Sequence, residues 1–232
     1  MRTVINSCLT GAETASGVVV MIDVFRASNT ILMLLSRGAA SIIPVATIQE
    51  AFGLKEKDPE CLLAGERGGV KVAGFDMGNS PHEASRTDLK GKEVVFTTSA
   101  GTQGIIRAEN AERILVGSFG NADALASMLD GVNPPLVTCL AMGTDGIRRA
   151  SEDELCALYL KGMLEGRPQD FHAMKNEIMQ GEGAQRLRSL GQDLDFSYCL
   201  ATDLFDFVPE VRRESSPMRI QAERWPLQRL HS

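Results

Sequence analysis

The sequence predicts an α/β protein of three layers, with helices on both faces of a mostly parallel or mixed central sheet. Short apolar runs rich in β-branched residues recur along the chain, and residues 18–22 are the clearest of them. Helical patterns separate these runs, and this alternation is typical of an α/β sheet covered on both faces. From about residue 151 the patterns are mostly helical, which predicts a helical C-terminal third.

The strands are expected where an apolar run ends at a polar residue or a glycine. The expected strands are residues 18–22, 41–45, 61–64, 94–97, 114–116 and 136–140. Pro44 has no backbone N–H for a ladder hydrogen bond, and this predicts that its strand lies near an edge of the sheet.

Capping boxes, in which a hydroxyl residue precedes a glutamate by three positions, mark several helix starts. They begin at Thr47, Ser80 and Ser151. Gly38 is a C-terminal cap, and Pro209 is expected to end the last helix. The expected helices are 28–37, one from 47, a short one from 80, 102–108, 121–129, 151–162, 171–178, 184–190 and 193–208.

One compact domain is expected over residues 1–232, because the chain has no linker-like stretch, low-complexity segment or fixed-period repeat. The polar tail, residues 212–232, leaves two interpretations open. It is either partly disordered or wraps around a partner subunit, so a homo-oligomer also remains open.

Charge and cysteine usage exclude several classes of protein. The net charge is −6 and no basic face is evident, which argues against nucleic acid as a partner. No apolar run is long enough for a membrane span, and no secretory leader is evident. The five cysteines have no C-x-x-C spacing, which favours a reducing cytoplasm, and the three histidines are dispersed. Any metal is therefore expected to be a hard cation such as Mg²⁺.

Polar residues follow the first strand at the edge where open α/β sheets bind ligands. Asp23 can be a metal ligand, a nucleophile or a general base, and spacing does not decide between these roles. Arg26 can hold an anion, while Ser28 can cap the next helix. The alternative is that Asp23 is a turn residue and Ser28 only a cap.

The glycine-dense stretch 63–81 suits an anion together with a divalent cation. Glu66 and Asp76 supply carboxylates, and Arg67 can form two hydrogen bonds to an oxyanion. Asn79 and Ser80 add small polar groups before the next helix. The alternative is a surface loop whose glycines only turn the chain.

Two further segments carry candidate ligand groups. Thr98, Ser99, Gly101 and Thr102 follow a strand and can surround an anion, although they lack the lysine of a nucleotide-binding P-loop. The alternative is that the threonines only close the strand. Glu152 and Asp153 begin a helix, where they either complement its dipole or bind metal.

Taken together, these blocks resemble the 2-phosphosulfolactate phosphatase family. Residues 20–30 resemble its V-I-D-V-x-R-A-[ST]-x-T segment, and residues 65–83 resemble its G-E-R-x-G and G-[FN]-x-x-G-N-S-P-x-E blocks. Residues 97–102 resemble T-T-x-x-G-T, and 139–143 and 151–153 resemble two later segments. The resemblance implies Mg²⁺-dependent hydrolysis of a small phosphate monoester with a second anionic group, 2-phosphosulfolactate, in coenzyme M biosynthesis.

The resemblance also implies roles for the candidate residues. The implied catalytic residues are Asp23, Arg26 and Arg67, and the implied metal ligands are Asp23, Glu66, Asp76, Glu152 and Asp153. Substrate is expected at Ser28, Asn79, Ser80, Thr98, Ser99, Gly101 and Thr102. Ala100 departs from the family, which commonly has asparagine there, so the substrate can differ.

Two alternatives belong to other classes. An isochorismatase-like cysteine hydrolase would use Cys139 as its nucleophile. A phosphometabolite-binding protein without catalytic activity is favoured only by Ala100.

Overall fold

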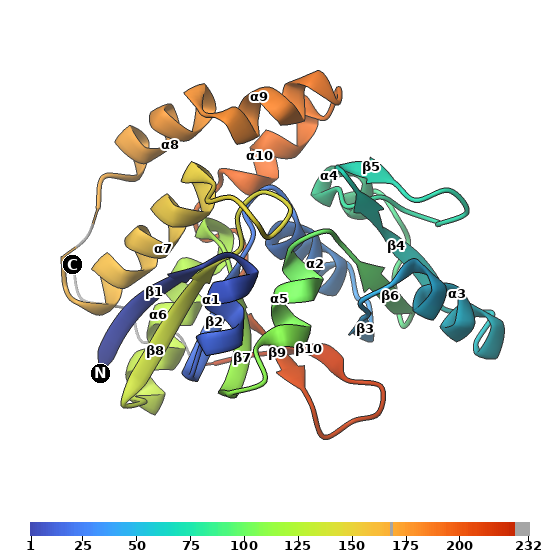
Figure 1. Ribbon diagram of the computed structural model, residues 1–232, viewed down its shortest axis with the longest axis horizontal. Helices are drawn as coiled ribbons and strands as arrows, with labels where there is room; N and C mark the ends of the chain where they lie inside the picture. The colour runs from blue at the N-terminus through green and yellow to red at the C-terminus, as the bar shows by residue number, and fades with distance from the viewer. Residues whose placement is uncertain (168, 226–232) are drawn as a thin grey trace.

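The computed structural model describes residues 1–167 and 169–225, and within them the chain forms a ten-stranded mixed sheet (Figure 1). The strands are β1 (Arg2–Ser7), β2 (Gly17–Ile22), β3 (Ser41–Pro44), β4 (Leu62–Arg67), β5 (Val70–Lys71), β6 (Glu93–Thr97), β7 (Ala111–Gly117), β8 (Leu136–Ala141), β9 (Val208–Arg212) and β10 (Arg219–Glu223). The predicted α/β class is confirmed.

The sheet consists of two parallel halves joined by an antiparallel hairpin. The first half has the order β1-β8-β2-β7, and the second has the order β3-β6-β4. Between them, β9 pairs with β7 at Leu115 and Glu210, and β10 pairs with β3 at Ile42 and Ile220. Each half therefore has its own row of carboxyl-terminal strand ends, where polar side chains can meet.

Helices cover both faces of this sheet. They are α1 (Cys8–Thr14), α2 (Ala27–Ser36), α3 (Ile48–Lys57), α4 (Pro81–Ser85), α5 (Gly101–Arg107), α6 (Ala122–Val132), α7 (Ser151–Leu164), α8 (Phe171–Gln180), α9 (Glu182–Ser189) and α10 (Phe196–Cys199), with the 3-10 turns η1 (Phe119–Asn121) and η2 (Asp193–Asp195). One hydrophobic core contains residues of α1, α2 and α5, while α6, α7 and α8 contribute to another.

Strand β2 shows how the sequence specifies this layering. Every residue of β2 is buried, which explains its continuous apolar run. Because side chains alternate along a strand, Val19 and Met21 enter the core on one face, and Val18 and Val20 enter the core on the other. This strand, buried between two helical layers, thus leads directly to Asp23, the first candidate site residue.

Most predicted elements are present, with corrections at helix starts and at one strand. The capping box at Thr47 is complete, and Ser80 caps α4. Ser151 is wrong as a cap, because Ala150 precedes α7 and no side chain caps it. The predicted edge position of Pro44 is also wrong, since β3 lies between β10 and β6. Pro44 is tolerated because β10 pairs with β3 only at Ile42.

The largest error concerns the C-terminal region. The predicted helix over 193–208 is replaced by η2, the four-residue α10, a loop and the start of β9, in which Pro209 lies. Asp203 has φ +51°, a left-handed conformation that a continuous α-helix excludes. Its carboxylate accepts the backbone N–H of Asp123 at the start of α6. The predicted tail, residues 212–232, begins at the last residue of β9 and forms β10 inside the sheet, and residues 226–232 lie outside the described residues.

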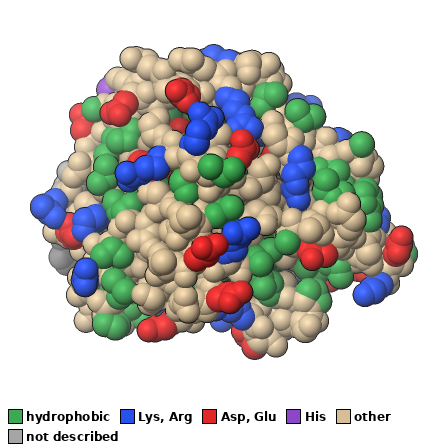
Figure 2. Space-filling view, viewed as in Figure 1, with side chains coloured by type: hydrophobic (Ala, Val, Ile, Leu, Met, Phe, Trp, Pro, Cys, Tyr) green, Lys and Arg blue, Asp and Glu red, His purple; other side chains and the backbone are tan. Residues whose placement is uncertain are grey.

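The surface agrees with the dispersed charge of the sequence. On the face that Figure 2 shows, basic and acidic side chains are interspersed. Over residues 1–167 and 169–225, no helix has both the length and the apolar character needed to cross a membrane.

Candidate active site

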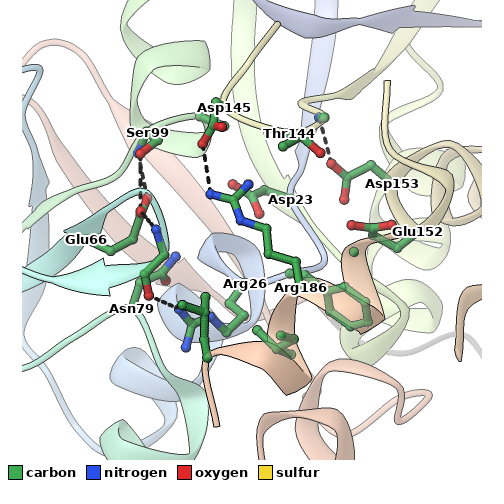
Figure 3. Close-up of a pocket in the computed structure, with 17 residues that line it drawn as sticks. Asp23, Arg26, Glu66, Asn79, Ser99, Thr144, Asp145, Glu152, Asp153 and Arg186 are labelled. Carbon is green, nitrogen blue, oxygen red and sulfur yellow. Dashed lines mark hydrogen bonds and ion pairs between the residues drawn. The ribbon is translucent and has the colours of Figure 1, made fainter. Parts of the chain in front are cut away.

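A cleft with an empty volume of about 590 Å³ lies where the carboxyl ends of the two half-sheets meet (Figure 3). Strands β2 and β8 lead into it from one half, and β4 and β6 lead into it from the other. Helices α7 and α9 supply further parts of its wall, together with Gly69, Asn79 and Leu190 in loops. Its charged and polar lining residues are Asp23, Arg26, Glu66, Asn79, Ser99, Thr144, Asp145, Glu152, Asp153 and Arg186.

The turn between β2 and α2 holds Asp23 in the cleft. The backbone N–H of Asp23 donates to Ser28 Oγ, and the N–H of Ser28 donates to the Asp23 carbonyl, both at 2.9 Å. Asp23 Oδ1 also accepts the N–H of Ala27 at 3.3 Å. A Cβ on Gly101 would stand 2.7 Å from the Ala27 Cβ and 3.0 Å from Asp23 Oδ2, so only glycine fits behind the carboxylate.

Three buried carboxylates gather beside this turn. Asp153 Oδ1 accepts the N–H of Val24 at 2.7 Å, and its Oδ2 accepts the N–H of Gly143 at 2.8 Å. Burial, with the charges of Glu66 and Glu152, raises the pKa of Asp23 to about 7. Burial also raises the pKa of Asp153 well above its usual range, and Asp23 and Glu152 add to that rise. The pKa of Glu152 is raised by burial as well.

Glu66 faces these carboxylates from the other half-sheet (Figure 3). Its Oε1 accepts the N–H of Ser99 at 2.7 Å, and its Oε2 accepts the N–H of Gly69 at 2.6 Å and the Ser99 hydroxyl at 3.2 Å. Glu66 thus ties the glycine loop to the loop after β6.

Two arginines line the cleft. Arg26 is 2% exposed; its Nη1 donates to Asp195 Oδ2 at 2.8 Å and its Nη2 to the Gly69 carbonyl at 3.1 Å. Arg186, on α9, contacts Asp145 with 3.3 Å between Nη2 and Oδ1. The cleft therefore presents carboxylates and guanidinium groups to one small volume, which suits a metal ion and an anion together.

The donor chemistry fits a hard divalent cation. In the part of the chain that the structure describes, no three His, Cys, Asp or Glu side chains form a ready metal-binding group. Asp23, Glu152 and Asp153 nevertheless share one buried region. Burial raises the pKa of each carboxyl, and the charge of Glu152 adds to the rise at Asp23 and Asp153. Among the described residues the buried Oδ1 of Asn79 has no hydrogen-bond partner, and it is a further oxygen that could bind a cation in the cleft.

Comparisons with known proteins point to one family. The family model described as 2-phosphosulpholactate phosphatase matches residues 5–214. A protein named "Probable 2-phosphosulfolactate phosphatase" from Carboxydothermus hydrogenoformans is 36% identical over 220 residues, which cover 89% of this chain and 91% of that protein. One with the same name from Thermotoga petrophila is 38% identical over 205 residues, covering 83% of this chain and 88% of its own.

The chain belongs to the 2-phosphosulfolactate phosphatase family. A third relative of that name, from Thermoplasma volcanium, is 35% identical over 198 residues, covering 85% of this chain and 91% of its own. Members of this family are phosphoric monoester hydrolases, and the chain is an enzyme of that class.

Half of the predicted site residues line the cleft of this family member. They are Asp23, Arg26, Asn79, Ser99, Glu66, Glu152 and Asp153. Others support the lining residues from behind: Ser28 and Gly101 shape the Asp23 turn, and Ser80 donates to Asp195. Thr98 and Thr102 exchange hydrogen bonds, each hydroxyl accepting the other's backbone N–H, and so begin α5.

Arg67 and Asp76 are not among the lining residues. The Arg67 guanidinium donates to the carbonyls of Glu66 and Ala46 and to the Thr97 hydroxyl. Asp76 is exposed, and it accepts the N–H of Leu63 at 2.7 Å. Their predicted functional roles therefore stay predictions.

Cys139 is not placed to be a nucleophile. Its side chain is fully buried in the core beneath α6 and α7, and burial raises the pKa of its thiol to about 12. The cysteine hydrolase alternative thus has no support at this residue.

The sequence did not identify Thr144, Asp145 and Arg186, which line the cleft, or Asp195 behind Arg26. Arg186 lies in a polar helix without a motif, and Asp145 follows a strand by four residues. Asp195 was assigned to a helix, whereas it lies buried in η2 beside Arg26. The positive φ of Asp145, between Gly143 and Gly146, marks a tight loop that the two glycines could have indicated.

Proposed function

We propose that this enzyme is a Mg²⁺-dependent phosphatase that hydrolyses 2-phosphosulfolactate to sulfolactate and phosphate. The observation that carries the proposal is the convergence of four buried carboxylates and Arg26 on one cleft. The names of the relatives support the substrate. The resemblance supports a place in coenzyme M biosynthesis, and five free, buried cysteines support a cytoplasmic location.

Asp23, Glu152 and Asp153 are the proposed metal ligands, and we propose that Glu66 and the Asn79 amide oxygen, which line the same cleft, complete the oxygen environment. A bound Mg²⁺ would neutralise charge on the phosphoryl oxygens. Asp153 is held through both of its oxygens by backbone N–H groups, so its carboxylate is oriented before a metal binds.

Arg26 is the proposed anion-binding group at the buried end of the cleft. Asp195 and the Gly69 carbonyl accept hydrogen bonds from two of its nitrogens, so the guanidinium is fixed in the cleft before substrate binds. Phosphoryl transfer depends mainly on positioning and charge neutralisation, and a fixed guanidinium supplies both. Ser99, held by Glu66, adds a hydroxyl on the same wall.

The test is phosphate release from synthetic 2-phosphosulfolactate by the purified protein. We expect release that EDTA abolishes and that added Mg²⁺ restores, with Asp23→Asn nearly inactive. The panel also includes 2-phospholactate and glycerol 2-phosphate. No release from any of the three would refute the proposal, and tight binding of an ester in Mg²⁺ without turnover would support the non-catalytic alternative.

A further inference from the structure

Arg186 differs from Arg26 in how firmly its guanidinium is held. Both line the cleft, but the Arg26 side chain is 3% exposed and hydrogen-bonded on two nitrogens, whereas the Arg186 side chain is 38% exposed. The one contact of Arg186 with Asp145 spans 3.3 Å. Because exposed ion pairs contribute little free energy, Arg186 can exchange Asp145 for another anion at small cost.

The position of this pair also matters. Arg186 extends from α9 across the cleft to Asp145, in the loop that follows β8 (Figure 3). In that view its guanidinium lies in the middle of the cleft, with Glu66 and Ser99 on one side and Glu152 and Asp153 on the other. An anion between α9 and the β8 loop would meet Arg186 as its nearest cationic partner among the lining residues.

The proposed substrate requires such a partner. By its chemistry, 2-phosphosulfolactate carries a phosphate ester flanked by a carboxylate and a sulfonate. If the phosphate binds Arg26 and a cation held by the carboxylates, the carboxylate and sulfonate of the substrate enter a cleft whose wall is largely acidic. Without a second cation these groups would be repelled.

We propose that Arg186 is a specificity-determining residue, which binds the second anionic group of the substrate, and that Asp145 holds Arg186 in place until substrate displaces it. This inference rests on the proposed phosphatase function. Arginine suits the role, since its planar guanidinium can form two parallel hydrogen bonds with a carboxylate or sulfonate. Asp145 then serves as a stand-in anion in the substrate-free enzyme.

The test compares 2-phosphosulfolactate with glycerol 2-phosphate, which has no second anion. In Arg186→Gln the ratio of kcat/KM for the first substrate over the second should fall at least about tenfold, with the loss mainly in KM. Arg186→Lys should retain only part of the wild-type ratio of kcat/KM values. In Asp145→Asn the ratio should rise a few-fold, because a competing anion has been removed.

Arg148→Gln is the matched control, because Arg148 is a more exposed arginine whose partner is Glu182 and which does not line the cleft. Its ratio should equal that of the wild type. An unchanged ratio in Arg186→Gln, or an equal fall in Arg148→Gln, would overturn the inference.

A second readout separates this inference from the proposed function. Calorimetric binding of sulfolactate, which needs no turnover, should weaken at least about tenfold in Arg186→Gln. If the wild type releases no phosphate from any ester, the proposed function fails, and the calorimetric comparison still decides the role of Arg186. Equal sulfolactate affinity in wild type and Arg186→Gln would refute it.

Discussion

Replacing Asp195 with asparagine should lower stability and activity together, because Asp195 is the anionic partner of Arg26, the buried arginine proposed to bind the substrate. The side chains of Asp195 and Arg26 are 2% and 3% exposed. Besides Arg26, Asp195 accepts the Ser80 hydroxyl at 2.6 Å and the His82 N–H at 3.0 Å. Asparagine keeps the volume, but it leaves the Arg26 charge with only neutral hydrogen-bond acceptors, its own amide oxygen and the Gly69 carbonyl.

The magnitude follows from this burial. Breaking a buried ion pair by removing one partner destabilises a protein by about 3–5 kcal/mol. For a chain of this length each kcal/mol lowers Tm by roughly 2–4 °C, so the Tm of Asp195→Asn should fall by roughly 6–20 °C. At a temperature where the variant is folded, kcat/KM should still fall by at least about tenfold, since Arg26 is no longer held toward the cleft.

The measurements are thermal unfolding and phosphate release, with Glu210→Gln as the control. Glu210 is buried and forms two hydrogen bonds with Arg113 at 2.8 and 2.9 Å, in the middle of the sheet and outside the cleft. That variant should lose stability and keep kcat/KM. A folded Asp195→Asn protein with wild-type kcat/KM would refute the reasoning, because Arg26 would then need no anionic partner.

Other predictions concern acidity, packing and Arg67. Burial raises the Asp23 pKa to about 7, so the metal-free folded state binds more protons than the unfolded state between pH 4 and 7. The free energy of unfolding of the metal-free protein should therefore fall as pH rises from 4 to 7. Urea titrations at each pH should show a flatter dependence for Asp23→Asn. In rate assays Gly101→Ala should lose most activity, because the added Cβ would contact Asp23. In unfolding assays Gly53→Ala should gain about 0.5–1 kcal/mol of stability, because a Cβ there meets no described heavy atom within 4 Å. Arg67→Lys should lower stability by about 1–3 kcal/mol through three lost contacts and largely keep kcat/KM; retained stability with lost kcat/KM would favour a catalytic Arg67 instead.

The part of the fold that could be predicted is the part that uses apolar strands and local capping. Strand β2 is buried on both faces, so its sequence is continuously apolar, and Asp23 at its end was found for that reason. The Thr47 cap was found because it is a contact within one helical turn.

Strands β9 and β10 could not be predicted from such patterns, because their charged residues are satisfied across the sheet. Arg113 pairs with Glu210, and Arg219 pairs with Glu93. These pairs join segments about a hundred residues apart in sequence. A polar hairpin in the middle of a sheet therefore looks like a tail until its partners are known.

The same limit applies to the site. Arg186 reaches the cleft, and Asp195 reaches Arg26 behind it, only because the C-terminal elements pack over the strand ends, and neither residue belongs to a local motif. Glu152 and Asp153 had two interpretations from the sequence, and their burial, at 5% and 2% exposure, favours the metal-ligand interpretation over a solvated helix start.

The most direct test of the proposed metal-dependent phosphatase is a Mg²⁺ titration of phosphate release from 2-phosphosulfolactate in wild type, Asp153→Asn and Glu154→Gln. Both substitutions remove a charge from the first turn of α7, but Glu154 pairs with Arg149 and does not line the cleft. We predict that Asp153→Asn raises the Mg²⁺ concentration for half-maximal rate by about tenfold or more, and that Glu154→Gln leaves it unchanged. An unchanged Mg²⁺ requirement in Asp153→Asn, or equal shifts in both variants, would contradict the account.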